Sequence, residues 1–158
     1  MAEHQVMASQ GAPAPSLLKP PADCWTLSLP NRLDALETAR LALLAHLAPL
    51  ALPDKLLFTL ELVLEEVLMN VKLHAFQDEQ QHLSELKAWF DDAQLYLRFE
   101  DEGLAFDPTQ AAEPAVPSSI AEAPTGGRGL LLVRKRASHM QYQRVGERNQ
   151  LTIALARP

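Results

Sequence analysis

The stretch Glu65–Phe76, EEVLMNVKLHAF, decides the fold prediction, because it carries polar groups within an apolar helical pattern. We expect a helix from Pro53 or Asp54 to about Phe76. Projected at about 100° per residue, its apolar face consists of Leu60, Val63, Leu64, Val67 and Val71. One border of that face is polar and consists of Thr59, Glu66, Asn70, His74 and Gln77. Polar groups at the border of a core need partners, so this border indicates a site.

Glu66 and Asn70 stand one helical turn apart and project in the same direction. The simplest interpretation is that Asn70 and His74 bind neighbouring backbone groups or water. A carboxylate beside a carboxamide also suits a metal–phosphate site, because an amide oxygen can ligate Mg²⁺ and a carboxylate can orient or deprotonate a hydroxyl. The pair therefore makes Glu66 a candidate base and Asn70 a candidate metal ligand.

The elements around this helix predict an α+β fold. We expect a strand over Cys24–Leu29, a helix capped by Asn31 and ending near Ala48, strands over Leu83–Asp91 and Gln94–Asp101, a helix over Gly127–Ser138, and strands over Met140–Val145 and Leu151–Ala156. The turns within the strand pairs are too short for parallel crossovers. The prediction is a two-layer α/β sandwich with a mixed, mostly antiparallel sheet and its helices on one face.

The length of 158 residues favours one domain, and residues 1–22 differ from the rest in composition. Their prolines, alanines and polar residues predict a flexible tail, so the domain is expected over residues 23–158. Inside it, residues 107–126 form a loop longer than the usual limit of about 12–15 residues, which indicates a lid, a binding loop or a disordered insertion. Four of the six glycines bracket this loop, namely Gly103, Gly126, Gly127 and Gly129. Such placement favours hinges and a mobile lid.

Composition excludes several classes of function. Twenty acidic against fourteen basic residues give a net charge of −6, which argues against direct nucleic-acid binding and against anionic membranes. A single cysteine, Cys24, excludes an intramolecular disulfide and a cysteine metal cluster. No apolar run predicts a membrane span and no leader is recognisable, so we expect a cytoplasmic protein. The sequence leaves open whether it forms a homodimer.

Two glycine motifs follow the polar helix. The segment Asp101–Phe106, DEGLAF, ends a strand with an Asp two positions before a Gly, and GGRGL at 126–130 opens a helix. Backbone N–H groups and the dipole at such a helix start favour an anion. Each motif is weak alone. The combination is informative because all the parts occur in one order: the Glu–Asn helix, the Asp–Gly turn, the long loop and the glycine-rich helix start.

In this order the motifs resemble the Bergerat-type ATP-binding fold of DNA gyrase and histidine kinases. EEVLMNVKLHAF resembles the N box of that superfamily, DEGLAF its first glycine box and GGRGLLLV its second. The resemblance covers about residues 24–158. Within the superfamily, the short length, the N-x-x-x-H-A pattern from Asn70 and the segment DEGLAFDP are most similar to the anti-sigma factor serine/threonine kinases of partner-switching systems.

The resemblance implies ATP and Mg²⁺ as cofactors and a role for each matching residue. Asn70 would ligate the Mg²⁺ on the triphosphate, and Glu66 would be the catalytic carboxylate. Asp101 would accept a hydrogen bond from the adenine amino group, with Gly103 beside the base. Residues 107–126 would form the ATP lid.

The phosphate-binding backbone would come from Gly127 and Gly129. Further nucleotide-binding positions implied by the resemblance are His74, Ala105, Phe106, Gly126, Arg128, Leu130 and Thr152. Ala105 departs from the pattern, because the superfamily often has a second glycine there. Arg40 matches a position where such kinases contact their protein partners.

These implications predict a Mg-ATP-dependent protein serine/threonine kinase and anti-sigma factor that phosphorylates a STAS-type anti-anti-sigma protein and sequesters a sigma factor. The alternative is a non-catalytic regulatory module that binds protein in an ATP-dependent manner. Residues 103–127 contain no Lys or Arg, which favours this alternative because phosphoryl transfer usually needs cations beyond Mg²⁺. Arg128 is the nearest cation, and Arg134 lies further along the same helix.

Overall fold

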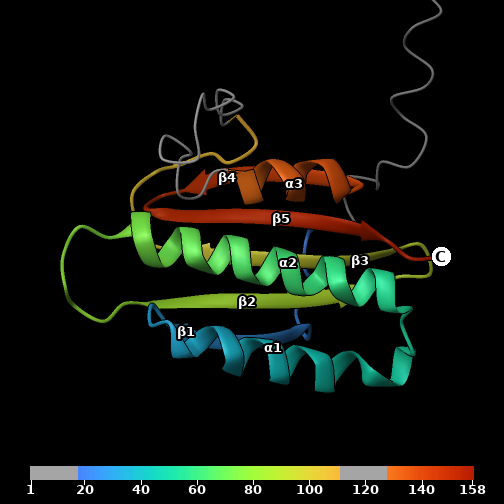
Figure 1. The fold of residues 1–158 in the computed structure, drawn as a ribbon. Coiled ribbons are helices and arrows are strands. Elements are labelled where there is room, and N and C mark those ends of the chain that lie inside the picture. The colour runs from blue at the N-terminus through green and yellow to red at the C-terminus, as the bar shows by residue number, and fades with distance from the viewer. Residues whose placement is uncertain (1–17, 111–127) are drawn as a thin grey trace, which may run out of the picture.

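The computed structural model describes residues 18–110 and 128–158 (Figure 1). Its elements in chain order are β1 (Trp25–Pro30), α1 (Asp34–Leu47), η2 (Ala48–Leu50), α2 (Asp54–Asn70), η3 (Val71–Ala75), β2 (Leu83–Phe90), β3 (Gln94–Asp101), α3 (Arg128–Arg136), β4 (His139–Val145) and β5 (Arg148–Ala156). Residues 1–17 and 111–127, which hold most of the predicted tail and lid together with Gly126 and Gly127, lie outside the described residues.

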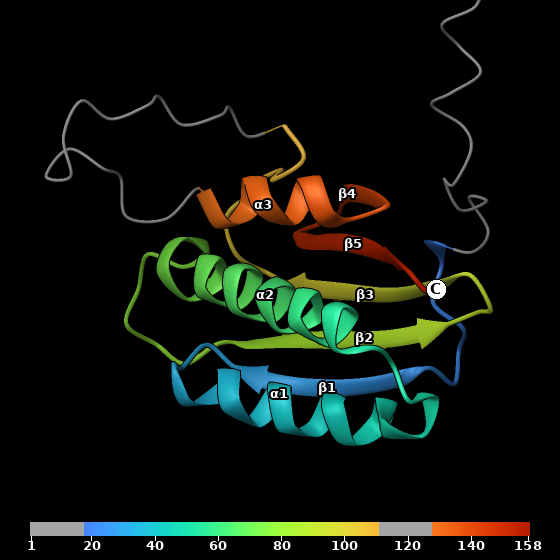
Figure 2. The ribbon, with the colours of Figure 1, turned by 45° about the vertical axis from the view of Figure 1, so that its right-hand side comes forward.

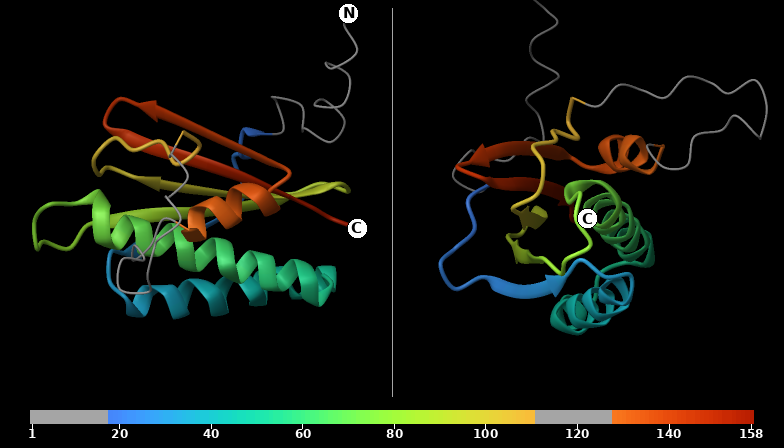
Figure 3. Two further views of the ribbon diagram at one scale, coloured as in Figure 1. Left: turned by 45° about the horizontal axis from the view of Figure 1, so that its top comes forward. Right: turned by 90° about the vertical axis from the view of Figure 1, so that its left-hand side faces the viewer.

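The strands form one five-stranded sheet in the order β1-β2-β3-β5-β4. Every pair of neighbours is antiparallel, so the described sheet contains no parallel pair, whereas the sequence predicted a mixed one. The helices α1, α2 and α3 cover one face of the sheet (Figure 3). Figure 2 shows α2 between α1 and α3, across the middle of the sheet. The predicted α+β sandwich with helices on one face is confirmed.

The core lies between α2 and β3. All eight residues of β3 are buried, because the strand is central, the helices cover its inner face, and side chains such as Leu18 and Trp89 pack on its outer face. The residues of α2 that pack inward are those of the predicted apolar face, since Leu60, Val63 and Leu64 are fully buried and Val67 nearly so. This packing fixes the rotation of α2, and therefore the direction in which its polar border points.

The predicted cap of the first helix is wrong, whereas the predicted end of the long helix near Phe76 is confirmed. The residue before α1 is Leu33, which makes no side-chain cap, while Asn31 Oδ1 accepts a hydrogen bond from the backbone N–H of His82 at 2.9 Å. Asn31 is therefore used to join β1 to the entry of β2 rather than to cap a helix. The long helix is regular only to Asn70, continues as a π-helical turn to Ala75, and gives way to extended backbone at Phe76. Such turns are rare and often occur at functional sites.

The outer face of the sheet, away from the helices, carries ionic and aromatic groups. Leu18, which the sequence prediction placed in the tail, is buried there, and its carbonyl accepts a hydrogen bond from Arg98 Nη2 at 2.7 Å. Further along the same face, Lys87 Nζ lies 2.8 Å from Glu100 Oε2. Within residues 18–110 and 128–158, no helix is long and apolar enough to span a membrane.

Candidate functional site

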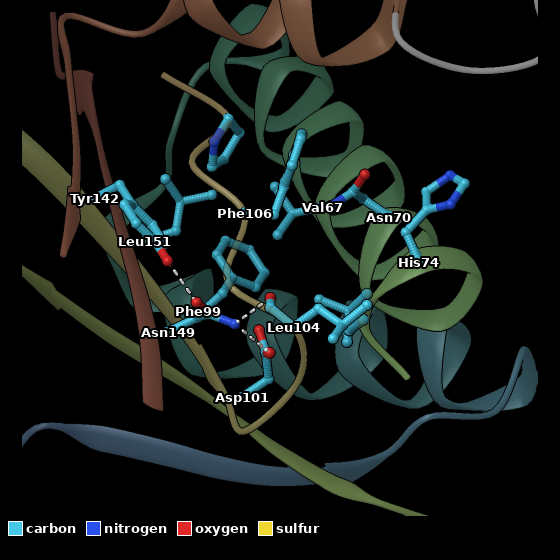
Figure 4. Close-up of a pocket in the computed structure, with 13 residues that line it drawn as sticks. Val67, Asn70, His74, Phe99, Asp101, Leu104, Phe106, Tyr142, Asn149 and Leu151 are labelled. Carbon is cyan, nitrogen blue, oxygen red and sulfur yellow. Dashed lines mark hydrogen bonds between the residues drawn. The ribbon is translucent and has the colours of Figure 1, made fainter. Parts of the chain in front are cut away.

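A pocket opens between the end of α2, the ends of β3 and β5, strand β4 and the segment after Gly103 (Figure 4). Its lining is mostly apolar, with a few convergent polar groups, as is typical of ligand sites. The lining residues are Val67, Asn70, Val71, His74, Ala75, Phe99, Asp101, Leu104, Phe106, Pro108, Tyr142, Asn149 and Leu151. The predicted positions Asn70 and His74 of the long helix are thus brought together with Asp101 and Phe106 of the segment after β3.

Asp101 is the charged group in the floor of this pocket, and it is only 7% exposed. Its Oδ1 atom accepts two hydrogen bonds, from the backbone N–H of Gly103 and from Asn149 Nδ2, both at 2.9 Å. Its Oδ2 atom accepts no hydrogen bond from any described residue. This oxygen is accessible from the pocket, where a donor from water or from a ligand can meet it.

Gly103 is required because the turn after β3 passes very close to the end of η3. A Cβ atom at Gly103 would lie 2.5 Å from the carbonyl oxygen of Ala75 and 2.6 Å from its Cβ. The same carbonyl accepts a hydrogen bond from the N–H of Leu104 at 2.7 Å. The glycine therefore fixes the turn against the helix that carries Asn70. The resemblance implied that Gly103 lies beside the base of the nucleotide. In the structure, the nearest neighbour of Gly103 is the backbone of Ala75.

Asn149 was missed by the sequence analysis, although it binds Asp101 directly. It is paired with Asp101 in the antiparallel register of β3 and β5, whereas the predicted strand began only at Leu151 and left Asn149 in the turn. Its Oδ1 atom accepts hydrogen bonds from Tyr142 Oη at 2.5 Å and Arg144 Nη1 at 2.9 Å. The sequence could have indicated Asn149 only through the correct pairing of β5 with β3. In that pairing Asn149 lies opposite Asp101 and on the same face of the sheet.

Asn70 and His74 mark the rim of the pocket on the helix side. Asn70 is half-buried and His74 is exposed. Figure 4 shows the His74 ring beyond Asn70, away from the hydrogen-bonded group around Asp101. The Asn70 amide makes no hydrogen bond with the described residues, so its oxygen is available to a ligand or metal.

Glu66 lies one turn before Asn70 and contacts the start of α3. A Cβ atom at Gly129 would lie 1.7 Å from Glu66 Oε2, so the absence of a side chain at Gly129 makes room for this carboxylate. Burial, with the neighbouring charge of Glu65, raises the pKa of Glu66. A raised pKa suits a group that must take up a proton near neutral pH. Glu66 is outside the pocket around Asp101 but next to the helix start that was predicted to hold phosphates.

Other predicted positions lie elsewhere. Thr152 is buried on the outer face, where its hydroxyl accepts a hydrogen bond from Arg98 Nε at 2.8 Å. Leu130 is part of the core, and Ala105 is exposed beside the pocket. Arg128 is the first residue of α3. Thr152, Leu130 and Ala105 supply no polar side-chain contact to Asp101 or Asn70 in the part of the chain that the structure describes.

Arg40 is held within the helical layer. Its guanidinium binds both carboxylate oxygens of Glu37, at 2.7 and 2.9 Å, and Glu61 of α2 at 3.3 Å. These bonds raise the pKa of Arg40 above its usual value. Arg40 therefore joins α1 to α2.

The sheet, the helices and the polar pocket define an ATP-binding domain of the histidine kinase-like class. The chain matches the histidine kinase-like ATPase domain family over residues 29–155 and belongs to that family, and its two-layer architecture is the Bergerat fold. It is also similar to the serine/threonine-protein kinase BtrW of Bordetella bronchiseptica, with 36% identity over 99 residues, which cover 63% of this chain and 70% of that protein. Both findings support ATP binding and a phosphotransferase of the kinase type.

Proposed function

We propose that this protein is a Mg-ATP-dependent serine/threonine kinase that phosphorylates a STAS-type anti-anti-sigma protein and sequesters a sigma factor in the cytoplasm. The observation that carries the nucleotide part is the Asp101 carboxylate, buried in the pocket with Oδ1 occupied and Oδ2 free. A fixed acceptor in an apolar pocket selects a base with an exocyclic amino group, as adenine has. The name of the similar kinase supports a protein hydroxyl as phosphate acceptor.

The phosphates would extend from this pocket toward α3, past Asn70 and Glu66. No group of three or more acidic, His or Cys side chains suitable for a metal occurs among the described residues. An amide oxygen such as that of Asn70 still fits Mg²⁺, because this ion is usually held by one or two protein ligands, water and substrate phosphates. When bound, Mg²⁺ would neutralise charge on the phosphates.

Glu66 would act on the protein substrate. Its carboxylate would accept the proton of the attacking serine or threonine hydroxyl as the oxygen–phosphorus bond forms and the bond to the ADP leaving group breaks. The raised pKa of Glu66 favours proton uptake at this step. The open space at Gly129 lets the carboxylate lie at the start of α3.

The second candidate function is a binding module in which ATP only controls access to partners. It is supported by residues 103–127, which supply no Lys or Arg. In both functions Arg40 would serve the partner surface of α1. Its ion pairs with Glu37 and Glu61 would have to rearrange, or be completed by the partner, on binding.

Two measurements test the proposal. Calorimetry should show that ATP binds more tightly than inosine triphosphate, whose base lacks the amino group, and that Asp101→Asn removes this preference. Incubation of the protein with labelled ATP and a purified STAS protein should transfer label to that protein. If ATP strengthens binding of the STAS protein without any transfer, the binding module is the correct function; if no nucleotide binds, both functions are excluded.

A further inference from the structure

Asn149 has a hydrogen-bonding arrangement that a purely structural asparagine would not need. Its Nδ2 group donates to Asp101 Oδ1 and the carbonyl oxygen of Leu104, both at 2.9 Å, and to the carbonyl oxygen of Gly103 at 3.3 Å. These acceptors are the last residue of β3 and two residues of the turn that follows it and borders the pocket. The side chain is only 7% exposed, so these bonds are shielded from water.

The carbonyl oxygen of the Asn149 amide is also fixed by hydrogen bonds. Tyr142 and Arg144 of β4 both donate to its Oδ1 atom, and Arg144 Nη1 also donates to the carbonyl oxygen of Gly103 at 2.9 Å. Acceptors therefore surround the NH₂ group and donors surround the carbonyl oxygen, which leaves one orientation for the amide. Figure 4 shows this chain of bonds running from Tyr142 through Asn149 to Asp101.

This arrangement decides which oxygen of Asp101 can meet a ligand. Asn149 and the N–H of Gly103 share Oδ1, and no described residue donates to Oδ2. A carboxylate free to rotate could present either oxygen and would accept from donors in several positions. Fixed from one side, it offers one acceptor in one direction.

We propose that Asn149 is a positioning residue that fixes Asp101 with a single free acceptor atom, Oδ2, and so sets the preference for a base with an exocyclic amino group. The inference rests on the proposed function, because it assigns the selectivity of the same pocket. Asn149 acts through Asp101 and does not itself bind the base. Tyr142 and Arg144 support it by holding its amide in one orientation.

The isosteric substitution Asn149→Asp tests this inference. It replaces the donor facing Asp101 with an acceptor, so two carboxylates would repel at about pH 8 and the fixed geometry would be lost. We expect ATP affinity to fall about 10- to 100-fold, as for loss of a hydrogen bond to a charged group. The ratio of ATP to inosine triphosphate affinity should fall with it.

Acid should restore the variant. Two adjacent carboxyl groups hold one proton between them at a higher pH than a lone one does, and the protonated new carboxyl could again donate to Asp101 Oδ1. At about pH 6, ATP affinity of Asn149→Asp should therefore recover at least severalfold. Other charged and titratable groups around the cluster are Tyr142, Arg144 and Glu147 of the hairpin, Glu102 of the turn and His74 of η3. The wild type contains the same groups, so the difference between the two pH profiles isolates the new pair.

The matched control is Gln143→Glu, the same amide-to-carboxylate change on the exposed face of the same hairpin, where Gln143 Nε2 donates to Gln150 Oε1 at 2.7 Å. It should leave ATP affinity, selectivity and the pH profile as in the wild type. If Asn149→Asp does not fold, Tyr142→Phe tests the inference instead, because it removes one donor to Asn149 Oδ1 without adding charge. This variant should weaken ATP binding and lower the selectivity severalfold.

If the tested variant keeps the wild-type ratio of ATP to inosine triphosphate affinity, the inference is overturned. The proposed function still stands in that case, provided that the wild type binds ATP. Weaker binding of Asn149→Asp that is independent of pH and leaves the selectivity ratio intact also overturns the inference, because a general structural loss would have that effect. If the wild type binds neither nucleotide, the proposed function and this inference fail together.

Discussion

The two ends of the site are built in different ways. At the end around Asp101, which we call the base end, Asp101, Asn149, Tyr142, Arg144 and the turn after β3 form a continuous set of hydrogen bonds. The opposite end, formed by Glu66, Asn70 and Gly129, we call the phosphate end. Among the described residues, no hydrogen bond holds the side chain of Glu66 or Asn70.

This difference indicates how binding is divided. The base end exists before the ligand arrives, so little conformational freedom is lost there on binding. At the phosphate end the Glu66 carboxylate and the Asn70 amide have no hydrogen-bond partner among the described residues, so both are available to a cation and its phosphates. Base recognition should therefore survive changes that abolish phosphate chemistry, and the predictions below test that separation.

The largest effect is expected from Glu66→Gln. Removal of a positioned general base should lower phosphate transfer to the STAS protein about 10²–10⁴-fold. ATP affinity should stay close to that of the wild type, because the base end is untouched. Glu79→Gln, the same change at an exposed glutamate outside the site, is the matched control and should transfer normally. Wild-type transfer by Glu66→Gln would exclude the catalytic role.

The same variant has a stability signature. Burial raises the pKa of Glu66 in the folded protein above its unfolded value, so its contribution to stability is fully present at acid pH and is lost as pH rises through the folded pKa. Glu66→Gln should therefore melt at the same or a higher temperature than the wild type at pH 7, and the difference should vanish at low pH. Thermal melts across this range check the sign.

The two site glycines provide the next contrast. In Gly103→Ala the new methyl would meet the backbone of Ala75, which cannot move aside, so we expect a loss of about 1–3 kcal/mol in unfolding free energy and weaker ATP binding. In Gly129→Ala the atoms nearest to the methyl would be those of the Glu66 carboxylate, the far end of a flexible side chain. That variant should keep its stability, helped by the helix propensity of alanine, but lose transfer activity. Denaturant melts and transfer assays should separate the two, and equal stability losses would contradict the contrast.

The base end illustrates what the sequence could and could not predict. Local signals were sufficient for Asp101, Gly103 and the inward face of α2, because a strand end, a glycine and a helical period are each properties of a short segment. Asn149 depends on the register between β3 and β5, and register is fixed by pairing across distant parts of the chain. A prediction that ended the strand at Leu151 could not include it.

Asn31 and Thr152 show the same limit in the fold. An asparagine before a helix is a common cap, but here its side chain binds the backbone entering β2, a contact made across 51 positions. Thr152 alternates onto the outer face with Arg98, because neighbours along a strand point to opposite faces. The π-helical turn that ends the long helix also had no local signal.

Asn70→Ala should affect only the phosphate end, by a smaller amount. Loss of an oxygen ligand should remove the Mg²⁺-dependent part of ATP affinity, about tenfold, the effect of roughly 1.4 kcal/mol. Affinity measured in excess chelator should equal that of the wild type, because the base end is intact. Titrations of ATP with Mg²⁺ and with chelator decide this, and a loss under both conditions would show that Asn70 supports the pocket rather than the metal.

The smallest effect is expected from Glu100→Gln, which tests whether the two ends differ for local reasons. Glu100 precedes Asp101 but points to the outer face. Burial there would raise the pKa of Glu100. The hydrogen bond from Lys87 and the charges of Lys87, Arg148 and Arg98 outweigh burial, so the pKa is lowered. Because the pKa of Glu100 is lower in the folded protein than its unfolded value of 4.5, the charged group stabilises the fold above pH 4.5. This stabilisation is lost as the pH falls through the folded pKa. The variant should thus lose about 1 kcal/mol at pH 7 and nothing in strong acid. Because the charge of Glu100 lies on the other side of β3, ATP affinity, selectivity and transfer should all remain at wild-type values. A change in selectivity would mean that the base end depends on the outer ion pairs and not on Asn149 and its neighbours alone.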